Sequence, residues 1–115
     1  MSLHVSILNT TVSRDTELIG KMDLFVVGKL SGSGIKPQEF KTRVVKGGKG
    51  QLTTFNQNFT LNVPATAADA RLLFEVKDED VTTDDMVGIA WMNLKNCNAL
   101  NRGGKNLYEV RLHYK

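Results

Sequence analysis

Seven stretches of the chain are predicted to be β-strands. Five alternate apolar and polar residues with the period of two that is typical of strands facing a core, and two are apolar runs. Near the N-terminus, for example, Leu3, Val5 and Ile7 share one face. The alternating strands are LHVSI, EFKTRVVK, FNQNFTLNV, ARLLFEVK and LYEVRLHY. The apolar runs are DLFVVGKL and MVGIAWMNL, of which the second is predicted to be buried. Turn-rich segments such as SGSGIKP and KGGKG separate the predicted strands, and only PATAADA favours a short helical turn. The pattern predicts an all-β fold, an antiparallel Greek-key β-sandwich of seven to eight strands.

Composition is that of an ordinary globular domain. With 115 residues, 41% hydrophobic and 23% charged, the chain is expected to be a single domain spanning residues 1–115. Its only cysteine, Cys97, leaves no disulfide framework and no multi-cysteine zinc site. The start MSLHVSILNTT lacks the features of a signal peptide, and no run of about 18 apolar residues occurs. We therefore expect a cytoplasmic protein.

Negative charge is concentrated in two short segments of a chain whose net charge is +3. Eight of the 12 acidic residues lie there: Asp15, Glu17, Asp23, Asp78, Glu79, Asp80, Asp84 and Asp85. Asp23 opens the second predicted strand, and the others fall in connections between strands. Connections that are distant in sequence cluster at the ends of a Greek-key sandwich, so the two segments are predicted to meet.

Two acidic connections at one end of a sandwich would form a cup of carboxylates. Such carboxylates repel one another, and a hard divalent cation removes the repulsion. Calcium accepts six to eight oxygens in irregular loops, whereas magnesium demands a stricter octahedron. A ligand set without His or Cys favours calcium over zinc. The alternative is that both segments are solvated turns.

Five stretches match, in order and spacing, the landmarks of a known family: LHVSIL, GKMDLFVVGKL, FKTRVVK, FNQNFTLNV and LLFEVKDEDVTTDDMVG. The second stands where that family has a Gly-Lys-Ser-Asp-Pro-Tyr-Val type motif, and the fifth is similar to its Asp-x-Asp loop. Over almost its whole length the chain thus resembles a C2 domain. Starting at the strand before the first acidic loop implies the type II permutation. Its closing eighth strand lies either beyond Lys115 or within NLYEVRLHYK.

The resemblance implies calcium-ligand roles. Asp23 matches the aspartate of the Ser-Asp-Pro motif, and Asp78 and Asp80 match the Asp-x-Asp pair. Asp85 matches the aspartate that stands three residues before the loop-closing glycine, Gly88.

Two ligand positions stay open. The family has a ligand six residues before Asp23, where this chain has Glu17, with Asp15 two residues earlier. The third loop is one residue shorter than is common in the family, so that either Asp84 or Asp85 fills its ligand position.

A basic segment, KPQEFKTRVVKGGKG, is the second candidate site. Its cations are Lys36, Lys41, Arg43, Lys46 and Lys49. Alternation places Lys41, Arg43 and Val45 on one face of a single strand. Anionic headgroups attract such a cluster by about 1 kcal/mol per cation, and the resemblance implies phosphoinositide binding at a lysine-rich concave face. The alternative is a solvated strand protected at its edge by lysines. No aromatic residues alternate with the cations, which argues against nucleic acid.

Apolar residues also occur within the acidic segments: Leu18, Ile19 and Val81. If exposed beside bound calcium, they would enter the membrane interface, a gain of several kcal/mol at roughly 25 cal/mol per Å². Alternatively, Leu18 and Ile19 fold back and pack the loop.

No catalytic motif is found, and we expect the protein not to be an enzyme. His4 and His113 occupy outward positions without a nucleophile nearby in sequence, and KGGKGQLTT lacks the spacing of a phosphate-binding loop. The predicted function is calcium-dependent binding of anionic phospholipid membranes, phosphatidylserine or phosphoinositide, by a monomer associated peripherally with the cytoplasmic side. The alternative is a calcium-independent C2 module that binds a protein partner.

Overall fold

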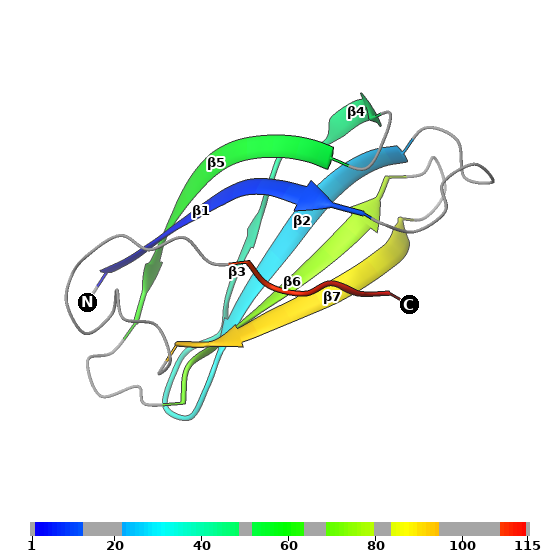
Figure 1. Cartoon of the computed structure of the whole chain (residues 1–115). Helices are drawn as coiled ribbons and strands as arrows, with labels where there is room; N and C mark the ends of the chain where they lie inside the picture. The colour runs from blue at the N-terminus through cyan, green and yellow to red at the C-terminus, as the bar shows by residue number, and fades with distance from the viewer. Residues whose placement is uncertain are drawn as a thin grey trace.

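The chain folds into two antiparallel β-sheets that face each other (Figure 1). The computed structural model describes residues 2–12, 22–48, 52–63, 69–79, 84–94 and 109–114. Their strands are β1 (Ser2–Thr11), β2 (Met22–Ser31), β3 (Gln38–Lys41), β4 (Val45–Gly48), β5 (Leu52–Asn62), β6 (Arg71–Asp78), β7 (Asp85–Asn93) and β8 (His113–Tyr114). No helix that could cross a membrane occurs in these ranges.

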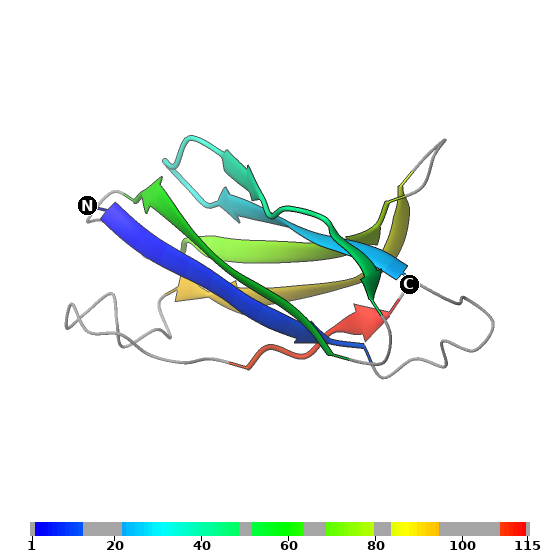
Figure 2. The same cartoon turned by 90° about the horizontal axis from the view of Figure 1, so that it is seen from above.

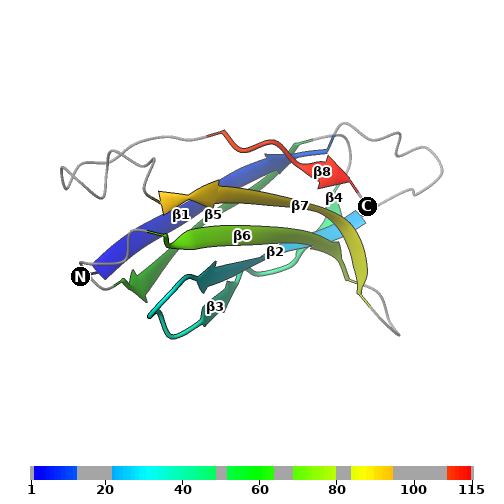
Figure 3. The same cartoon turned by 90° about the horizontal axis from the view of Figure 1, so that it is seen from below.

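The smaller sheet is the pair β1–β5, seen from outside in Figure 2. The larger sheet has the order β3-β2-β6-β7-β8, and β4 pairs with β2 as well (Figure 3). Because β1 pairs with β5 and β2 with β6, the chain crosses between the sheets, as in a Greek key. The predicted antiparallel β-sandwich is therefore confirmed.

Between the sheets lie two groups of buried apolar side chains. The first core cluster consists of Leu30, Ile35, Phe40, Leu61, Val63, Ala70, Leu72 and Leu94. The second core cluster consists of Val12, Met22, Leu24, Val26, Phe55, Val76 and Val87. The inward residues predicted for the first strand, Leu3, Val5 and Ile7, pack against these clusters. Alternation therefore located the core correctly, because a half-buried strand must put every second side chain inside.

Strand β2 is buried on both of its faces. Leu24 and Val26 point into the second core cluster. Phe25 and Val27 are 2% and 5% exposed yet belong to neither cluster, so they lie on the opposite side of the large sheet. We call that side, which faces away from β1 and β5, the outer face (Figure 3).

The prediction that EFKTRVVK is one continuous strand is wrong, because the chain leaves the ladder between β3 and β4. Four residue steps from Lys41 to Val45 stand opposite only three steps from Val27 to Leu24. The extra residue makes a β-bulge, which shifts the alternation by one position. As a result Val45 packs against the second core cluster and does not share the exposed side of Lys41.

Thr42 bridges this break. Its backbone amide donates to the carbonyl of Val26 at 2.9 Å, and its Oγ1 accepts from the Val26 amide at 2.9 Å. The same hydroxyl donates to the Arg43 carbonyl at 3.0 Å. A side chain thus takes the place of a missing backbone partner, which keeps the buried amide of Val26 satisfied.

Two predictions near the C-terminus are corrected in part. MVGIAWMNL is not buried throughout, because Trp91 is 42% exposed. Within the described part of LYEVRLHY, only His113–Tyr114 form a strand, and Val110 is exposed where alternation would bury it. The count of eight strands comes from the break between β3 and β4. The helical turn expected in PATAADA falls mostly at 64–68, outside the described residues.

Gly28 makes room for an aromatic ring in the core. It stands opposite Phe40 in the β2–β3 ladder, and a Cβ at Gly28 would lie 2.0 Å from Cζ of Phe40. The Phe40 ring is in turn tilted against that of Phe59, with centroids 4.5 Å apart. The ring of Phe40 therefore fills the space left by the missing side chain.

We predict that Gly28→Ala lowers the free energy of unfolding by about 1–3 kcal/mol, because the ring cannot move without disturbing Phe59. Urea unfolding of the variant would measure this. Combining it with Phe40→Leu should recover part of the loss, since the clash disappears. A double variant that is destabilised by the full sum of both changes would contradict this account.

Candidate functional site

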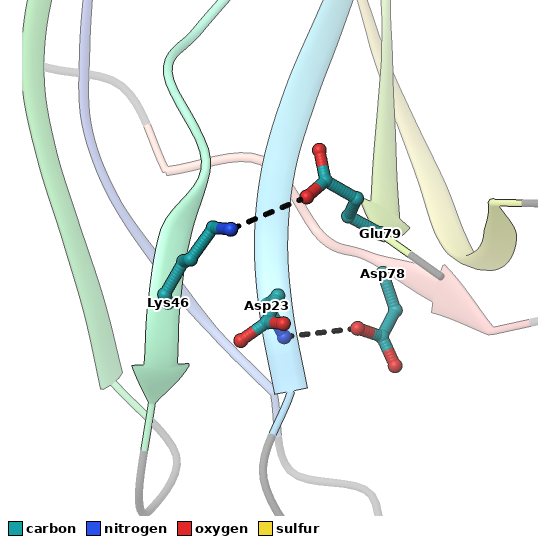
Figure 4. A network of polar contacts seen from close by, with 4 residues as sticks. All are labelled: Asp23, Lys46, Asp78 and Glu79. Atoms are coloured by element: carbon teal, nitrogen blue, oxygen red, sulfur yellow. Dashed lines mark hydrogen bonds and ion pairs between the residues drawn. The ribbon is translucent and has the colours of Figure 1, made fainter. Parts of the chain in front are cut away.

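The acidic residues Asp23 and Asp78, which are 55 positions apart in the sequence, meet at one end of the large sheet (Figure 4). Asp23 stands near the start of β2, and Asp78 ends β6, where it pairs in register with Leu24. The backbone amide of Asp23 donates to Oδ1 of Asp78 at 2.9 Å. The Glu79 amide donates to the Asp23 carbonyl at 2.8 Å. Antiparallel pairing of β2 and β6 thus brings the Asp78 carboxylate to the backbone of Asp23.

A third acidic strand end, the start of β7, lies beside the end of β6. Asp85 begins β7 and pairs in register with Asp78, although only its backbone is described. Asp84, just before it, is exposed. Three other predicted ligands, Asp15, Glu17 and Asp80, lie outside the described residues.

Four described residues bring carboxylates to this end of the sheet: Asp23, Asp78, Glu79 and Asp84. Within these ranges, no group of three acidic, His or Cys side chains is close enough together to hold a metal ion. Carboxylate oxygens are the hard donors that suit calcium. One oxygen of Asp78 also has a structural role, since it accepts the Asp23 amide. The donor chemistry therefore fits calcium, with further oxygens required from elsewhere.

The basic residues extend from this end along the β3–β4 edge. Lys46 of β4 reaches toward the acidic end, with Nζ 3.9 Å from Oε1 of Glu79 (Figure 4). Both side chains are well exposed, so the pair contributes little stability. Arg43 is exposed, and its backbone amide donates to Oε1 of Gln57 on β5 at 2.9 Å.

Lys41 covers part of the outer face. Its Nζ lies 4.5 Å from the ring centroid of Phe25, a cation–π contact. The ammonium over the ring covers part of Phe25, which helps to bury it on a face without a second sheet. Lys41 and Arg43 are both exposed, but the single strand face predicted for Lys41, Arg43 and Val45 is not formed.

Beside Lys41 the outer face has cations that the sequence did not single out. Lys29 of β2 forms an ion pair with Glu75 of β6, with Nζ 2.9 Å from Oε1. The hydrogen bond and the charge of Glu75 raise the pKa of Lys29, which is therefore protonated at neutral pH. Lys77, opposite Phe25 in the β2–β6 ladder, lies on the same face. Alternation along β2 and β6 was the signal that could have located these lysines.

The remaining predicted lipid contacts are not gathered at this site. Lys36 is exposed in the connection between β2 and β3, at the end of the large sheet opposite to Asp23. Lys49, Leu18, Ile19 and Val81 lie outside the described residues. Their predicted contacts with lipid stay predictions.

Comparison with known proteins gives one family. The family model described as C2 domain matches residues 1–110. No curated protein matches the chain. The type II strand order stays a prediction.

Solved structures agree with this match. A C2 domain of plant extended synaptotagmin 1 is 28% identical over 83% of this chain and 70% of its own, with a TM-score of 0.65. A C2 domain-containing protein from a putative elicitor-responsive gene has a TM-score of 0.71 and 23% identity, covering 99% of this chain and 77% of its own. Human GIVD cytosolic phospholipase A2 has a TM-score of 0.67 at 24% identity over 83% of this chain. The matching part is 12% of the phospholipase chain.

The hydrogen bond from the Asp23 amide to the Asp78 carboxylate allows a test of the structural role of Asp78. We predict that Asp78→Ala lowers the free energy of unfolding by about 1–2 kcal/mol, because the Asp23 amide loses its acceptor. Asp78→Asn keeps an oxygen acceptor and should lose less than half of that. The two variants would be compared by urea unfolding in chelator. Equal losses in both would show that charge, rather than the hydrogen bond, matters at this position.

Proposed function

Because the chain belongs to the C2 domain family, we propose that it binds anionic phospholipid membranes, and that calcium at the acidic end promotes the binding. The observation that supports this most is the meeting of Asp23 and Asp78 beside a sheet face that carries Lys29, Lys41 and Lys46. The proposal is for a binding module, associated peripherally with the cytoplasmic side of a membrane. It assigns no reaction to the chain.

The acidic end of the large sheet and the lysines of the outer face have opposite effects on binding to an anionic lipid surface. Carboxylates at the end of the sheet repel anionic headgroups, and the exposed lysines attract them by about 1 kcal/mol each. Asp23 and Asp78 would hold the ion together with Asp80, with either Asp84 or Asp85, and with Glu17 or Asp15. When bound, calcium would neutralise these carboxylates and accept phosphate oxygens of the lipid.

A calcium-independent protein-interaction module is the second candidate. The hydrogen bond that the Asp23 amide donates to the Asp78 carboxylate favours it, because this bond gives Asp78 a structural role that needs no ion. Under this alternative the acidic end stays negatively charged, and the sandwich presents a surface to a protein partner. The response to calcium separates the two candidates.

We predict that calcium, but not magnesium, raises the melting temperature of the domain by several degrees at concentrations far above Kd, because the ion binds only the folded state. Asp80→Asn and Asp78→Asn should each weaken calcium binding at least tenfold and abolish calcium-dependent sedimentation with phosphatidylserine vesicles. Calorimetry and sedimentation in calcium and in chelator would measure both effects.

The matched control is Asp69→Asn. Asp69 is exposed, and its carboxylate accepts from the Ser33 amide near the opposite end of the large sheet. This variant should bind calcium as the unmodified domain does. Unchanged calcium affinity in Asp80→Asn would overturn the ligand assignment and leave the protein-interaction candidate.

We also predict that reversing the charge of both Lys41 and Arg43 to Glu weakens binding to phosphoinositide-containing vesicles at least tenfold, since two attractions are replaced by repulsions. Glu39→Lys, an exposed change on the same sheet, should strengthen it. Thr54→Glu, at an exposed position of β5 in the other sheet, should have little effect. If all three variants bind the vesicles equally well, the cations of the outer face take no part in lipid binding.

A further inference from the structure

Trp91, the only tryptophan of the chain, is exposed near the end of β7, next to the edge strand β8 of the large sheet. It lies on β7 and is 42% exposed, although its neighbours Ala90 and Met92 contact or enter the interior. Its ring stacks on that of His113 from β8, with centroids 4.6 Å apart and an interplanar angle of 19°. The ring is therefore held in place by a neighbour and is still accessible.

An apolar strip surrounds this ring on the outer face. Trp91 pairs in register with Leu73 of β6, and Ile89 precedes it by two residues on the same side of β7. Both Leu73 and Ile89 are only half-buried, and neither packs against a core cluster. Side chains paired across antiparallel strands are close neighbours, so the three form one surface strip.

Cations border the strip on the same face. Leu73 pairs with Lys29, and Arg71 stands two residues from Leu73 on the same side of β6. Lys41 is three strands away on β3, about 14 Å at the usual strand spacing. The five described cations of this face, Lys29, Lys41, Lys46, Arg71 and Lys77, outnumber its four acids, Asp23, Glu39, Glu75 and Glu79. Figure 3 shows the strands that carry them lying side by side.

We propose that this whole face lies against an anionic lipid bilayer, with Trp91 as its interfacial anchor and the lysines on the headgroups. Tryptophan is enriched at membrane–water interfaces, because its ring is apolar while its N–H is polar. Excess positive charge around an exposed aromatic strip is complementary to a negative lipid surface. The inference rests on the proposed membrane function, which already assigns lysines of this face to lipid, and adds to it Trp91 as the anchor and the orientation of the face.

The single tryptophan makes this contact measurable. Trp91 emission would be recorded while the full chain is titrated, with calcium present, with phosphatidylcholine vesicles that contain phosphatidylserine. We expect the emission to shift to shorter wavelength and to be quenched by lipids brominated near the headgroup end of the acyl chains. Vesicles of phosphatidylcholine alone should produce neither change.

Variants test the anchor directly. Trp91→Ala should weaken vesicle sedimentation roughly tenfold, as expected for losing the contact of about half a tryptophan side chain with the interface. Leu52→Ala is the matched control, since Leu52 is 59% exposed on β5 in the other sheet and should not contact lipid. A tryptophan moved to that position, Leu52→Trp with Trp91→Phe, should show no vesicle-dependent shift.

The outcomes separate this inference from the proposed function. Vesicle sedimentation without any change in Trp91 emission would overturn the anchor and leave membrane binding through another surface. No sedimentation under any condition would overturn both. An emission shift with an acidic peptide but not with vesicles would assign the face to a protein ligand and overturn the inference.

Discussion

The burial of β2 on both of its faces is the constraint on which the rest of the structure depends. Leu24 and Val26 require a second sheet over the inner side, and the β1–β5 pair supplies it. Phe25 and Val27 require cover on the outer side, where no second sheet lies among the described residues. There the ammonium of Lys41 lies over the Phe25 ring. A cation thus provides part of the cover for this apolar strand, and the same contact puts positive charge on the outer face.

The acidic end depends on the same strand. β2 begins where β6 ends, and their antiparallel ladder brings Asp78 within hydrogen-bonding distance of the Asp23 amide. Pairing of β2 with β6 therefore positions Asp23 and Asp78 without any contribution from a ligand. Carboxylates at one end and lysines along the adjoining face give the domain an electrostatic asymmetry that its net charge of +3 conceals. An anionic surface would meet repulsion or attraction according to the side that approaches it.

Part of the candidate site could be predicted and part could not. The meeting of Asp23 and Asp78 was predictable, because strand ends that flank distant connections gather at one end of a sandwich. The side of Val45 was predicted wrongly, since alternation assumes a constant register and a bulge between Thr42 and Val45 breaks it. Trp91 was not singled out, because its apolar run is typical of a strand buried on both faces. Whether such a run is covered depends on what packs over it, which local sequence does not encode.

By itself, the sequence determined the number and position of most strands, the inward side of each, and the two concentrations of acidic residues. These follow from local chemistry, since alternation, turn residues and charge are properties of neighbouring positions. Only the tertiary structure decided which strands are neighbours, where β3 and β4 separate, and that Lys41 lies over Phe25. It also decided that Trp91 stays exposed against His113. The reason is that each of these features is a contact between residues distant in the chain, and the free energy of such contacts depends on the packing of the two sheets as a whole.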